Sequence, residues 1–382
     1  MNITANIVHS GFDGKTCWVH ARPAVIPGRA GKNPTLLITT YPLRLTGNDV
    51  FYETHTMYST DLGKNWSALQ PARESLGRRP FPGGLEEICS DLVPQWHAVS
   101  GKVLMTGHTV VYQNDELLPG LRPRSTVWSV LDQTTWKWSS YERLQMPDHV
   151  KFFNAGAGST QRVDLPNGEL LLPIYFAGTN QSRPEGNSHL TTVLRCSFDG
   201  RQLCYLEHGS ELSVPQPRGL GEPSLTTVNQ RFFLTIRNDV TGYVCSGTDG
   251  LHFSQPIPWC FDDGSELGNY NTQQHWLTHA DRLFLIYTRR GANNDHVMRH
   301  RAPLFIAEVD QDKLCVIRKT EQILVPNRGA RLGNFGVHPL SNTEYLVVVS
   351  EWMQTTNPNP YDYTICQKYG SDNSIFMVKV SF

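Results

Sequence analysis

The sequence has no excess of positive charge and no long apolar run. Its 382 residues include 34 Lys and Arg against 35 Asp and Glu, which gives a formal net charge of -1. A protein that holds nucleic acid through bulk electrostatics needs a clear surplus of Lys and Arg, so we expect no nucleic-acid partner. The longest apolar runs, at 170–176 and 346–349, are far shorter than the roughly 18 residues of a membrane-spanning helix. We therefore expect no membrane partner.

The beginning of the chain lacks the features of a secretion signal. Residues 1–15 contain neither a basic segment nor an apolar segment of the kind that precedes a cleavage site. We expect a soluble protein that is cytoplasmic, or secreted or periplasmic with its signal peptide absent from this chain.

Cysteine spacing of the kind found in metal sites is also missing. The sequence contains 8 cysteines but no Cys-x-x-Cys pair. A chain of this length does not depend on disulfides, and cysteine packs well in a core as a small residue. We expect free, buried thiols, no metal site and no other cofactor.

Sustained helical periodicity is scarce, and short β-type runs replace it. Charged residues make up 18% of the chain, below the roughly 25% of an average domain, which favours strands and turns over long charged helices. Similar runs, each preceded by a small polar turn, occur at 35–40, 103–106, 169–175, 231–236, 282–287 and 344–350. A recurrence every roughly 50 to 70 residues is typical of a β-propeller. No linker divides the chain, so we predict an all-β fold with one six-bladed propeller domain over residues 1–382.

One turn repeats late in the predicted blades. Residues 59–66 fit the pattern S-x-D-x-G-x-x-W, and weaker copies occur at 129–136, 197–200 and 246–253. In such a turn the Ser and Asp side chains bond the backbone, Gly adopts the left-handed conformation and Trp packs between sheets. This turn is known as the Asp box, and it indicates architecture without carrying chemistry.

Four segments, taken in order, resemble the sialidase (neuraminidase) superfamily of six-bladed propellers. They are His-Ala-Arg-Pro-Ala-Val at 20–25, the Asp box at 59–66, the glycine-rich segment 153–159 with 167–173, and Gly-Glu-Pro-Ser-Leu at 221–225 followed by Arg237. The likeness extends over most of the chain. It implies an exo-acting glycoside hydrolase that removes a terminal acidic or deoxy sugar from a glycan or oligosaccharide.

The resemblance also implies a set of substrate-binding arginines. Enzymes of this family hold the substrate carboxylate with three guanidinium groups, which offer paired donors and keep their charge when partly desolvated. By position these are Arg22, Arg237 and Arg301. Arg299 and Arg290 compete for the third role.

Carboxylates supply the candidate acid and base. The family's general acid lies in the loop before the first Asp box, where this chain has Asp49, with Glu53 and His55 as alternatives. Glu222 begins an otherwise apolar strand beside Pro223, so we expect it to be partly desolvated and to need a partner, which is how enzymes tune an acid or a base.

The family's tyrosine nucleophile has no counterpart in this chain. The matching position falls at Val337 or its neighbour in the segment 334–340, and no tyrosine stands there. True sialidase activity is therefore in question, but glycosidase chemistry by two carboxylates or by a histidine remains open at the same pocket.

The 14 histidines provide an alternative. Those expected on inner strands or their exit loops are His20, His97, His108, His275, His300 and His338. We take His97 as a candidate catalytic residue, and His275 and Tyr270 as candidate sugar-binding residues. Together with Tyr175 and the arginines, such a cluster resembles propeller-type polysaccharide lyases, in which Arg or His neutralises a uronate and Tyr or His abstracts the α-proton. A non-catalytic carbohydrate-binding propeller is the third possibility.

Overall fold

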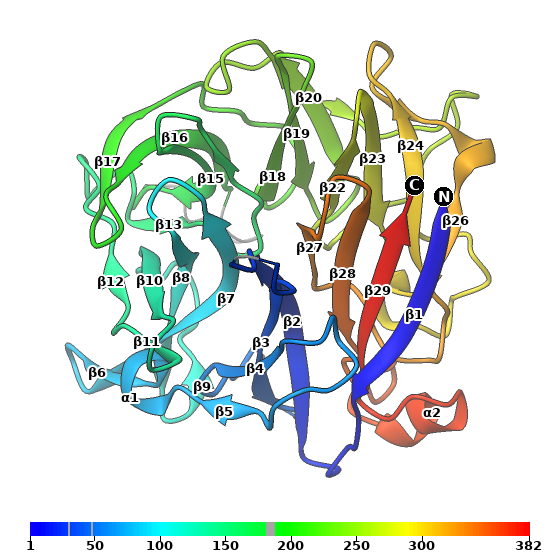
Figure 1. Cartoon of the computed structure of the whole chain (residues 1–382), viewed down its shortest axis with the longest axis horizontal. Helices are drawn as coiled ribbons and strands as arrows, with labels where there is room; N and C mark the ends of the chain where they lie inside the picture. The colour runs from blue at the N-terminus through cyan, green and yellow to red at the C-terminus, as the bar shows by residue number, and fades with distance from the viewer. Residues whose placement is uncertain (30, 47–48, 181–187) are drawn as a thin grey trace.

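The computed structural model describes residues 1–29, 31–46, 49–180 and 188–382. In this part of the chain the strands form six antiparallel sheets, which are arranged like the blades of a propeller around a common centre (Figure 1). The all-β, propeller-like arrangement predicted from the sequence is confirmed.

The first three sheets follow one another along the chain. The first sheet contains β2 (Thr16–Ile26), β3 (Thr35–Arg44), β4 (His55–Ser59) and β5 (Gln70–Pro71). The second contains β6 (Arg79–Phe81), β7 (Leu85–His97), β8 (Lys102–Gln113), β10 (Thr126–Asp132) and β11 (Lys137–Trp138), with β9 (Glu116–Leu117) and β12 (Glu142–Arg143) alongside. The third contains β13 (Asn154–Gly156), β15 (Glu169–Ala177), β16 (Leu190–Phe198) and β17 (Leu203–His208), and β14 (Val163–Asp164) pairs with β15.

The last three sheets continue the series. The fourth contains β18 (Gly221–Val228), β19 (Arg231–Arg237), β20 (Tyr243–Gly247) and β21 (Ile257–Pro258). The fifth contains β22 (His275–His279), β23 (Arg282–Tyr287), β24 (Leu304–Asp310) and β25 (Cys315–Val316), with β26 (Gln322–Val325) on β24. The sixth contains β27 (Phe335–Pro339), β28 (Glu344–Ser350), β29 (Ile375–Ser381) and β1 (Asn2–His9). The described helical segments are short: α1 (Arg73–Leu76), α2 (Tyr363–Lys368) and the 3-10 turns η1 (Met298–His300) and η2 (Arg318–Thr320).

The apolar runs in the sequence arise because each sheet packs between two others. In β28, Val347 and Val349 belong to a core cluster shared with the fifth sheet, whereas Leu346 and Val348 belong to a cluster shared with the first sheet. Alternate side chains of a strand point to opposite faces, so a strand buried on both faces needs a continuous apolar run. This geometry explains why the period of the runs predicts the architecture.

The ring closes through the two ends of the chain. Strand β1 pairs with β29, with Asn2 opposite Ser381, and the two termini lie side by side in Figure 1. Along the ring, β2 contacts β7, β13 contacts β8 and β10, β15 contacts β18, β18 contacts β22, β22 contacts β27, and β27 contacts β2. The sheets are therefore neighbours in chain order, and the second sheet lies opposite the fifth.

The turn at residues 59–66 ties the first sheet to the sixth. The Ser59 hydroxyl accepts a hydrogen bond from the backbone N–H of Gly63 at 2.9 Å, and Asp61 accepts from the backbone N–H groups of residues 64 and 65 at 3.0 and 2.9 Å. Gly63 has a φ of +86°, which suits glycine. The Trp66 ring packs against the apolar cluster between the two sheets.

The close backbone contact at Gly336 allows the packing between the sixth and first sheets to be tested. A Cβ atom at Gly336 would lie 2.6 Å from Cδ of Pro23 and 3.1 Å from Cα of Arg22, across the contact between β27 and β2. We expect Gly336→Ala to lower the free energy of unfolding by about 1–3 kcal/mol, because the packed strands must shift apart. Urea unfolding measures this loss. Gly221→Ala is the matched control, since its Cβ would meet Tyr175 no closer than 3.9 Å; an equal loss in both variants contradicts the argument.

The cysteines match the expectation of free thiols, and most of them are buried. All 8 cysteines are free thiols, and six of them, Cys17, Cys89, Cys196, Cys245, Cys315 and Cys366, are buried. No helix in the described residues is long and apolar enough to cross a membrane.

Candidate functional site

Three inner strands carry a β-bulge that turns one side chain toward the centre of the ring. The pairing registers shift at 19–22 in β2, 90–93 in β7 and 221–224 in β18. Within these bulges His20, Asp91 and Glu222 have positive φ angles of 53°, 53° and 43°. A bulge adds a residue to one strand and so re-aims the side chains beside it. All three side chains line the same pocket.

Two further sheets place a residue with positive φ at the corresponding position. Ser159 follows β13 with a φ of 57°, and Asn271 precedes β22 with a φ of 52°. Such backbone conformations are uncommon outside glycine and cost about 1–3 kcal/mol each, and they persist where the surroundings hold them, often at functional sites. Ser159 donates a hydrogen bond to Asp91 at 2.8 Å, and Asn271 accepts one from Arg237 at 2.6 Å. We read this ring of strained residues as the framework of a site.

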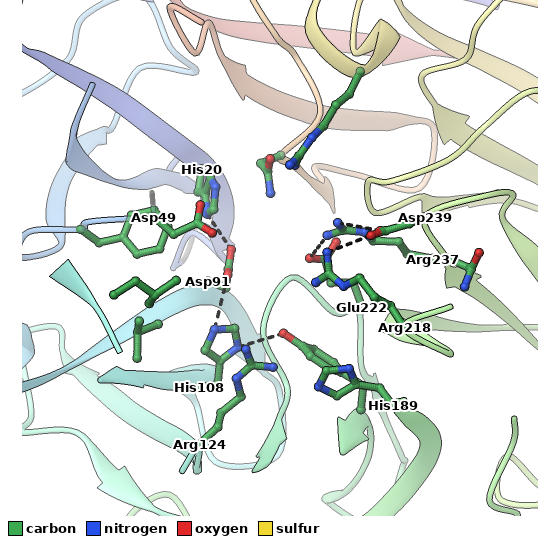
Figure 2. Close-up of a pocket in the computed structure, with 18 of the residues that line it drawn as sticks. His20, Asp49, Asp91, His108, Arg124, His189, Arg218, Glu222, Arg237 and Asp239 are labelled. Atoms are coloured by element: carbon green, nitrogen blue, oxygen red, sulfur yellow. Dashed lines mark hydrogen bonds and ion pairs between the residues drawn. The ribbon is translucent and has the colours of Figure 1, made fainter. Parts of the chain in front are cut away.

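The pocket inside this framework is lined by residues from all six sheets and their loops, and Figure 2 shows part of its lining. Its cationic residues are seven arginines, Arg122, Arg124, Arg218, Arg237, Arg299, Arg301 and Arg331. Its carboxylates are Asp49, Asp91, Glu222 and Asp239, and its histidines are His20, His108 and His189. Among the described residues, the lining thus has seven guanidinium groups against four carboxylates, so the pocket favours an anion.

Most of these arginines pair with none of the carboxylates that the structure describes. Arg237 pairs with Glu222 at 2.5 Å and Asp239 at 3.2 Å, and Arg218 pairs with Asp239 at 2.9 Å. The other five arginines of the pocket form no ion pair with any described carboxylate. Burial, followed by the charge of a neighbouring arginine, lowers the pKa of Arg122 to about 10 and that of Arg331 to about 9. A buried charge without a counter-ion is costly, so these groups are ready to accept an anionic ligand.

Glu222 and Arg237 form a close and largely buried ion pair in the pocket. Both side chains are 12% exposed, and Arg237 donates to Oε1 of Glu222 at 2.5 Å. Burial opposes the charge of Arg237, but Glu222 and Asp239 together raise its pKa above the ordinary value. Oε2 of Glu222 is buried and has no hydrogen-bond partner among the described residues. One carboxylate oxygen is thus fixed by arginine, and the other remains available to a ligand.

Asp91 is the centre of a second network on the other side of the pocket (Figure 2). Its Oδ1 lies 2.6 Å from Nδ1 of His20, and its Oδ2 lies 3.5 Å from Nε2 of His108. Arg22 lies 3.7 Å from the same carboxylate. Burial alone would raise the pKa of Asp91, but His20, His108 and Arg22 hold it well below the ordinary value. Asp91 is therefore ionised.

His108 links Asp91 to a tyrosine. Nδ1 of His108 lies 3.4 Å from the Tyr175 hydroxyl. Because Asp91 can accept only from a protonated Nε2, Nδ1 is left to accept the Tyr175 proton. Burial, assisted by the charge of Arg124, lowers the pKa of His108 to about 3, and burial raises the pKa of Tyr175 to about 12. The three residues form a continuous polar chain, in which Tyr175 keeps its proton and His108 is neutral at pH 7.

The structure brings four of the sequence-predicted site residues together. Asp49, Glu222, Arg237 and Arg301 all line the pocket. Arg301 is buried and donates to Asn334 at 3.0 Å. Asp49 is exposed and forms no ion pair with a described residue.

Arg22 does not line the pocket, although the resemblance assigns it to the substrate. It is fully buried and donates to Ser159 at 2.6 Å, to Gln273 at 3.1 Å and to the carbonyl oxygen of Phe335 at 3.3 Å. The bulge in β2 turns His20 toward the pocket and leaves Arg22 behind it. Arg22 therefore joins inner strands to one another.

The three remaining sequence candidates also lie outside the pocket lining. His97 ends β7 and contacts the Ser100 hydroxyl at 2.8 Å and the Gly168 carbonyl at 3.0 Å. It is fully buried in a hairpin, because the 13-residue strand carries it away from the Asp91 bulge.

His275 and Tyr270 are held by neighbouring side chains. His275 is buried, with Nδ1 at 2.7 Å from the Ser224 hydroxyl. The Tyr270 hydroxyl lies 2.6 Å from Nδ1 of His300, and Arg290 lies over its ring at 5.0 Å. Both side chains hold neighbouring elements together outside the pocket lining.

Several residues of the pocket were missed by the sequence reasoning. Asp91, Arg122, Arg124 and Arg331 had no assigned role, whereas His108 and Tyr175 were named in the lyase alternative. The Arg-Pro-Arg segment at 122–124 was an available signal, since two arginines stand in a proline-containing loop between β-type runs. Asp91 gave no signal, because the bulge that exposes it is invisible in the pattern of apolar residues.

The buried histidines of the pocket predict a loss of stability in acid. Burial lowers the pKa of His108 and of His189 to about 3, from an ordinary value of 6.5. Between these values the unfolded chain binds protons that the folded chain does not, so stability is complete above pH 6.5 and is lost as the pH falls toward 3. We expect each histidine to contribute a loss of about 1.4 kcal/mol per pH unit in this range.

Urea unfolding between about pH 7.5 and about pH 5.5 measures this dependence. His189→Gln keeps a donor for the Asn154 oxygen, which lies 3.2 Å from His189. In this variant we expect the free energy of unfolding to depend less steeply on pH, because one titrating histidine is removed. A slope equal to that of the wild type indicates instead that His189 is protonated in the folded state.

Comparisons with known proteins support the fold. No protein-family model matches the sequence, and no curated protein matches it. Among solved structures, the chain is similar to a protein of unknown function from Dyadobacter fermentans, with a TM-score of 0.68 and 13% identity, covering 100% of this chain and 99% of that one. It is also similar to Trypanosoma rangeli sialidase in complex with sialic acid (TM-score 0.63, 12% identity, 99% of this chain and 59% of that one).

A further similar structure is the K499G mutant of NanB sialidase from Streptococcus pneumoniae, with a TM-score of 0.60 and 12% identity, covering 94% of this chain and 68% of that one. This chain thus spans less than two thirds of the trypanosomal sialidase. At these identities the likeness shows the fold, and the fold is sialidase-like. The resemblance that the four sequence segments indicated is confirmed at that level.

Proposed function

We propose that the chain is an exo-acting glycoside hydrolase of sialidase-like type, built as a single six-bladed propeller over residues 1–382, which removes a terminal acidic sugar from a glycan. The observation that carries this proposal is the central pocket, in which five arginines that pair with no described carboxylate surround Glu222 and Asp49. The carboxylate of a sugar acid supplies the missing negative charge, and planar guanidinium groups suit it.

Two carboxylates supply the hydrolytic chemistry. In most glycosidases one carboxylic acid protonates the leaving oxygen, and a second carboxylate attacks the anomeric carbon or activates water. Glu222 comes from the fourth sheet and Asp49 from the loop before β4 in the first sheet, so they reach the pocket from opposite sides of the ring. We assign the acid to the exposed Asp49, and the second role to Glu222, whose Oε2 is free.

A polysaccharide lyase is the second candidate, and the Asp91–His108–Tyr175 chain favours it. A lyase neutralises a uronate carboxylate and then removes the proton next to it. Arg124 lies over the Tyr175 ring at 5.0 Å, which places a cation beside the group that would exchange the proton.

The experiment is a substrate panel. The chain is incubated with fluorogenic glycosides of sialic acid, of uronic acids and of neutral sugars, and separately with polyuronides. Hydrolysis predicts release from acidic glycosides only, with loss of release in Glu222→Gln. New ultraviolet absorbance from an unsaturated uronate indicates the lyase instead. Binding of acidic glycans without turnover of any substrate identifies a carbohydrate-binding protein and overturns the enzymatic proposal.

A further inference from the structure

The pocket arginines that form no ion pair with a described residue lie in two groups on opposite sides of the ring. Arg122 and Arg124, the first group, stand between β9 and β10 of the second sheet. Arg299 and Arg301 stand between β23 and β24 of the fifth sheet, and Arg331 lies in the segment that leads to β27; these three form the second group. Because the sheets are neighbours in chain order and the ring closes, the second and fifth sheets face each other across the pocket.

The electrostatic environment of the arginines follows this division in part. After burial, the largest effect on the pKa of Arg122 comes from Arg124, which lowers it. After burial, the largest effect on the pKa of Arg331 comes from Arg299, and that on Arg301 comes from Arg331. The largest such effect on Arg299 comes from Arg237, and Asp49 acts on Arg122, Arg299 and Arg331 alike. Each group therefore concentrates positive charge, and the single carboxylate of Asp49 is shared between the two.

The partners of these guanidinium groups orient them without neutralising them. Arg122 donates to the carbonyl oxygen of Leu118 at 3.0 Å, and Arg301 donates to the amide oxygen of Asn334 at 3.0 Å. Nη1 of Arg124 is buried and has no hydrogen-bond partner among the described residues. In Figure 2, Arg124 lies beside His108, across the pocket from Arg237. Fixed donors therefore remain on both walls.

We propose that the pocket binds a sugar carrying two anionic groups, one held by the Arg122–Arg124 group and the other by the Arg299–Arg301–Arg331 group. A single carboxylate can neutralise one of these groups and leaves the other as uncompensated buried charge, which is costly. A sugar acid that also bears a sulfate or phosphate ester, or a second carboxylate, supplies both counter-ions. The inference rests on the proposed function, since it names the ligand class of the same pocket.

A selenate soak tests this proposal without any turnover. Crystals of the full chain, grown without sulfate or phosphate, are soaked in selenate, whose selenium atom is located by anomalous scattering. We expect two selenate ions in the pocket, one within hydrogen-bond distance of Arg122 or Arg124 and one within that distance of Arg299, Arg301 or Arg331. One ion shared by both groups, or ions on one group alone, overturns the proposal.

Substitutions in each arginine group test whether the two ion positions are independent. In Arg122→Gln/Arg124→Gln the first ion is expected to be lost while the second remains, and in Arg299→Gln/Arg331→Gln the reverse is expected. Arg201→Gln, on the exposed surface, is the control and is expected to keep both ions. Loss of both ions in either double variant shows one shared site and contradicts the proposal. The soak reports where ions bind and not whether substrate is turned over. The two-anion proposal can therefore fail in a chain that hydrolyses acidic glycosides, and it can hold in a chain that has no hydrolytic activity.

Discussion

Glu222→Gln is expected to reduce kcat on an acidic glycoside by about 100- to 10,000-fold, the range in which a positioned acid or base contributes to catalysis. Glutamine keeps the shape of the side chain and an oxygen that can accept from Arg237, which now donates to Oε1 at 2.5 Å. It removes the charge and the second carboxylate oxygen, Oε2, which has no partner in the described residues. The variant is therefore expected to bind substrate but to react slowly.

Steady-state kinetics with the substrate found in the panel measures this effect, and circular dichroism checks that the fold is retained. Glu169→Gln is the matched control, because Glu169 pairs with Arg195 on the outer part of the third sheet at 2.7 Å and does not line the pocket. If the two variants have the same kcat, Glu222 takes no part in the chemistry, and the lyase network becomes the better candidate.

Asp91→Asn is expected to lower the free energy of unfolding by about 3–5 kcal/mol, the cost of breaking a buried ion pair from one side. The aspartate is 14% exposed, and the nearby Arg22 is fully buried. Among the described residues, the hydrogen-bond partners of the Arg22 guanidinium are neutral oxygens, on Ser159, Gln273 and Phe335. Removing the charge of Asp91 leaves Arg22 as a buried cation without a counter-ion.

Urea unfolding at neutral pH measures this loss. Asp312→Asn is the control, because Asp312 is 90% exposed in its ion pair with Arg231, and a surface pair contributes at most about 1 kcal/mol. If the two variants lose equal stability, Asp91 is not the counter-ion that holds Arg22 between the strands, and the ring framework must rest on other contacts.

The architecture could be predicted from the sequence because it depends on repetition. A strand buried on both faces needs an apolar run, and β28 shows the reason, with Val347 and Val348 packing into different cores. The site could be predicted in part. Glu222 and Arg237 mark the ends of apolar strands in the sequence, and the structure places both in the pocket.

Two of the remaining errors, at Arg22 and Asp91, have one physical cause, which is the β-bulge. An extra residue in a strand exchanges the faces of the residues that follow it. His20 therefore faces the pocket where the family pattern points to Arg22, and Asp91 enters the pocket although nothing in the pattern marks it. The arginines at 122–124 were missed for a different reason: they belong to a loop whose position depends on the closed ring.

The claim on which the function depends is that the central pocket recognises an acidic sugar. Binding of the Glu222→Gln chain to an array of acidic and neutral glycans tests it most directly, since a slow variant retains what it binds. We predict retention of glycans that end in an acidic sugar, and loss of that retention when Arg301→Gln is added. Retention of neutral glycans, or retention that Arg301→Gln leaves unchanged, would contradict the account.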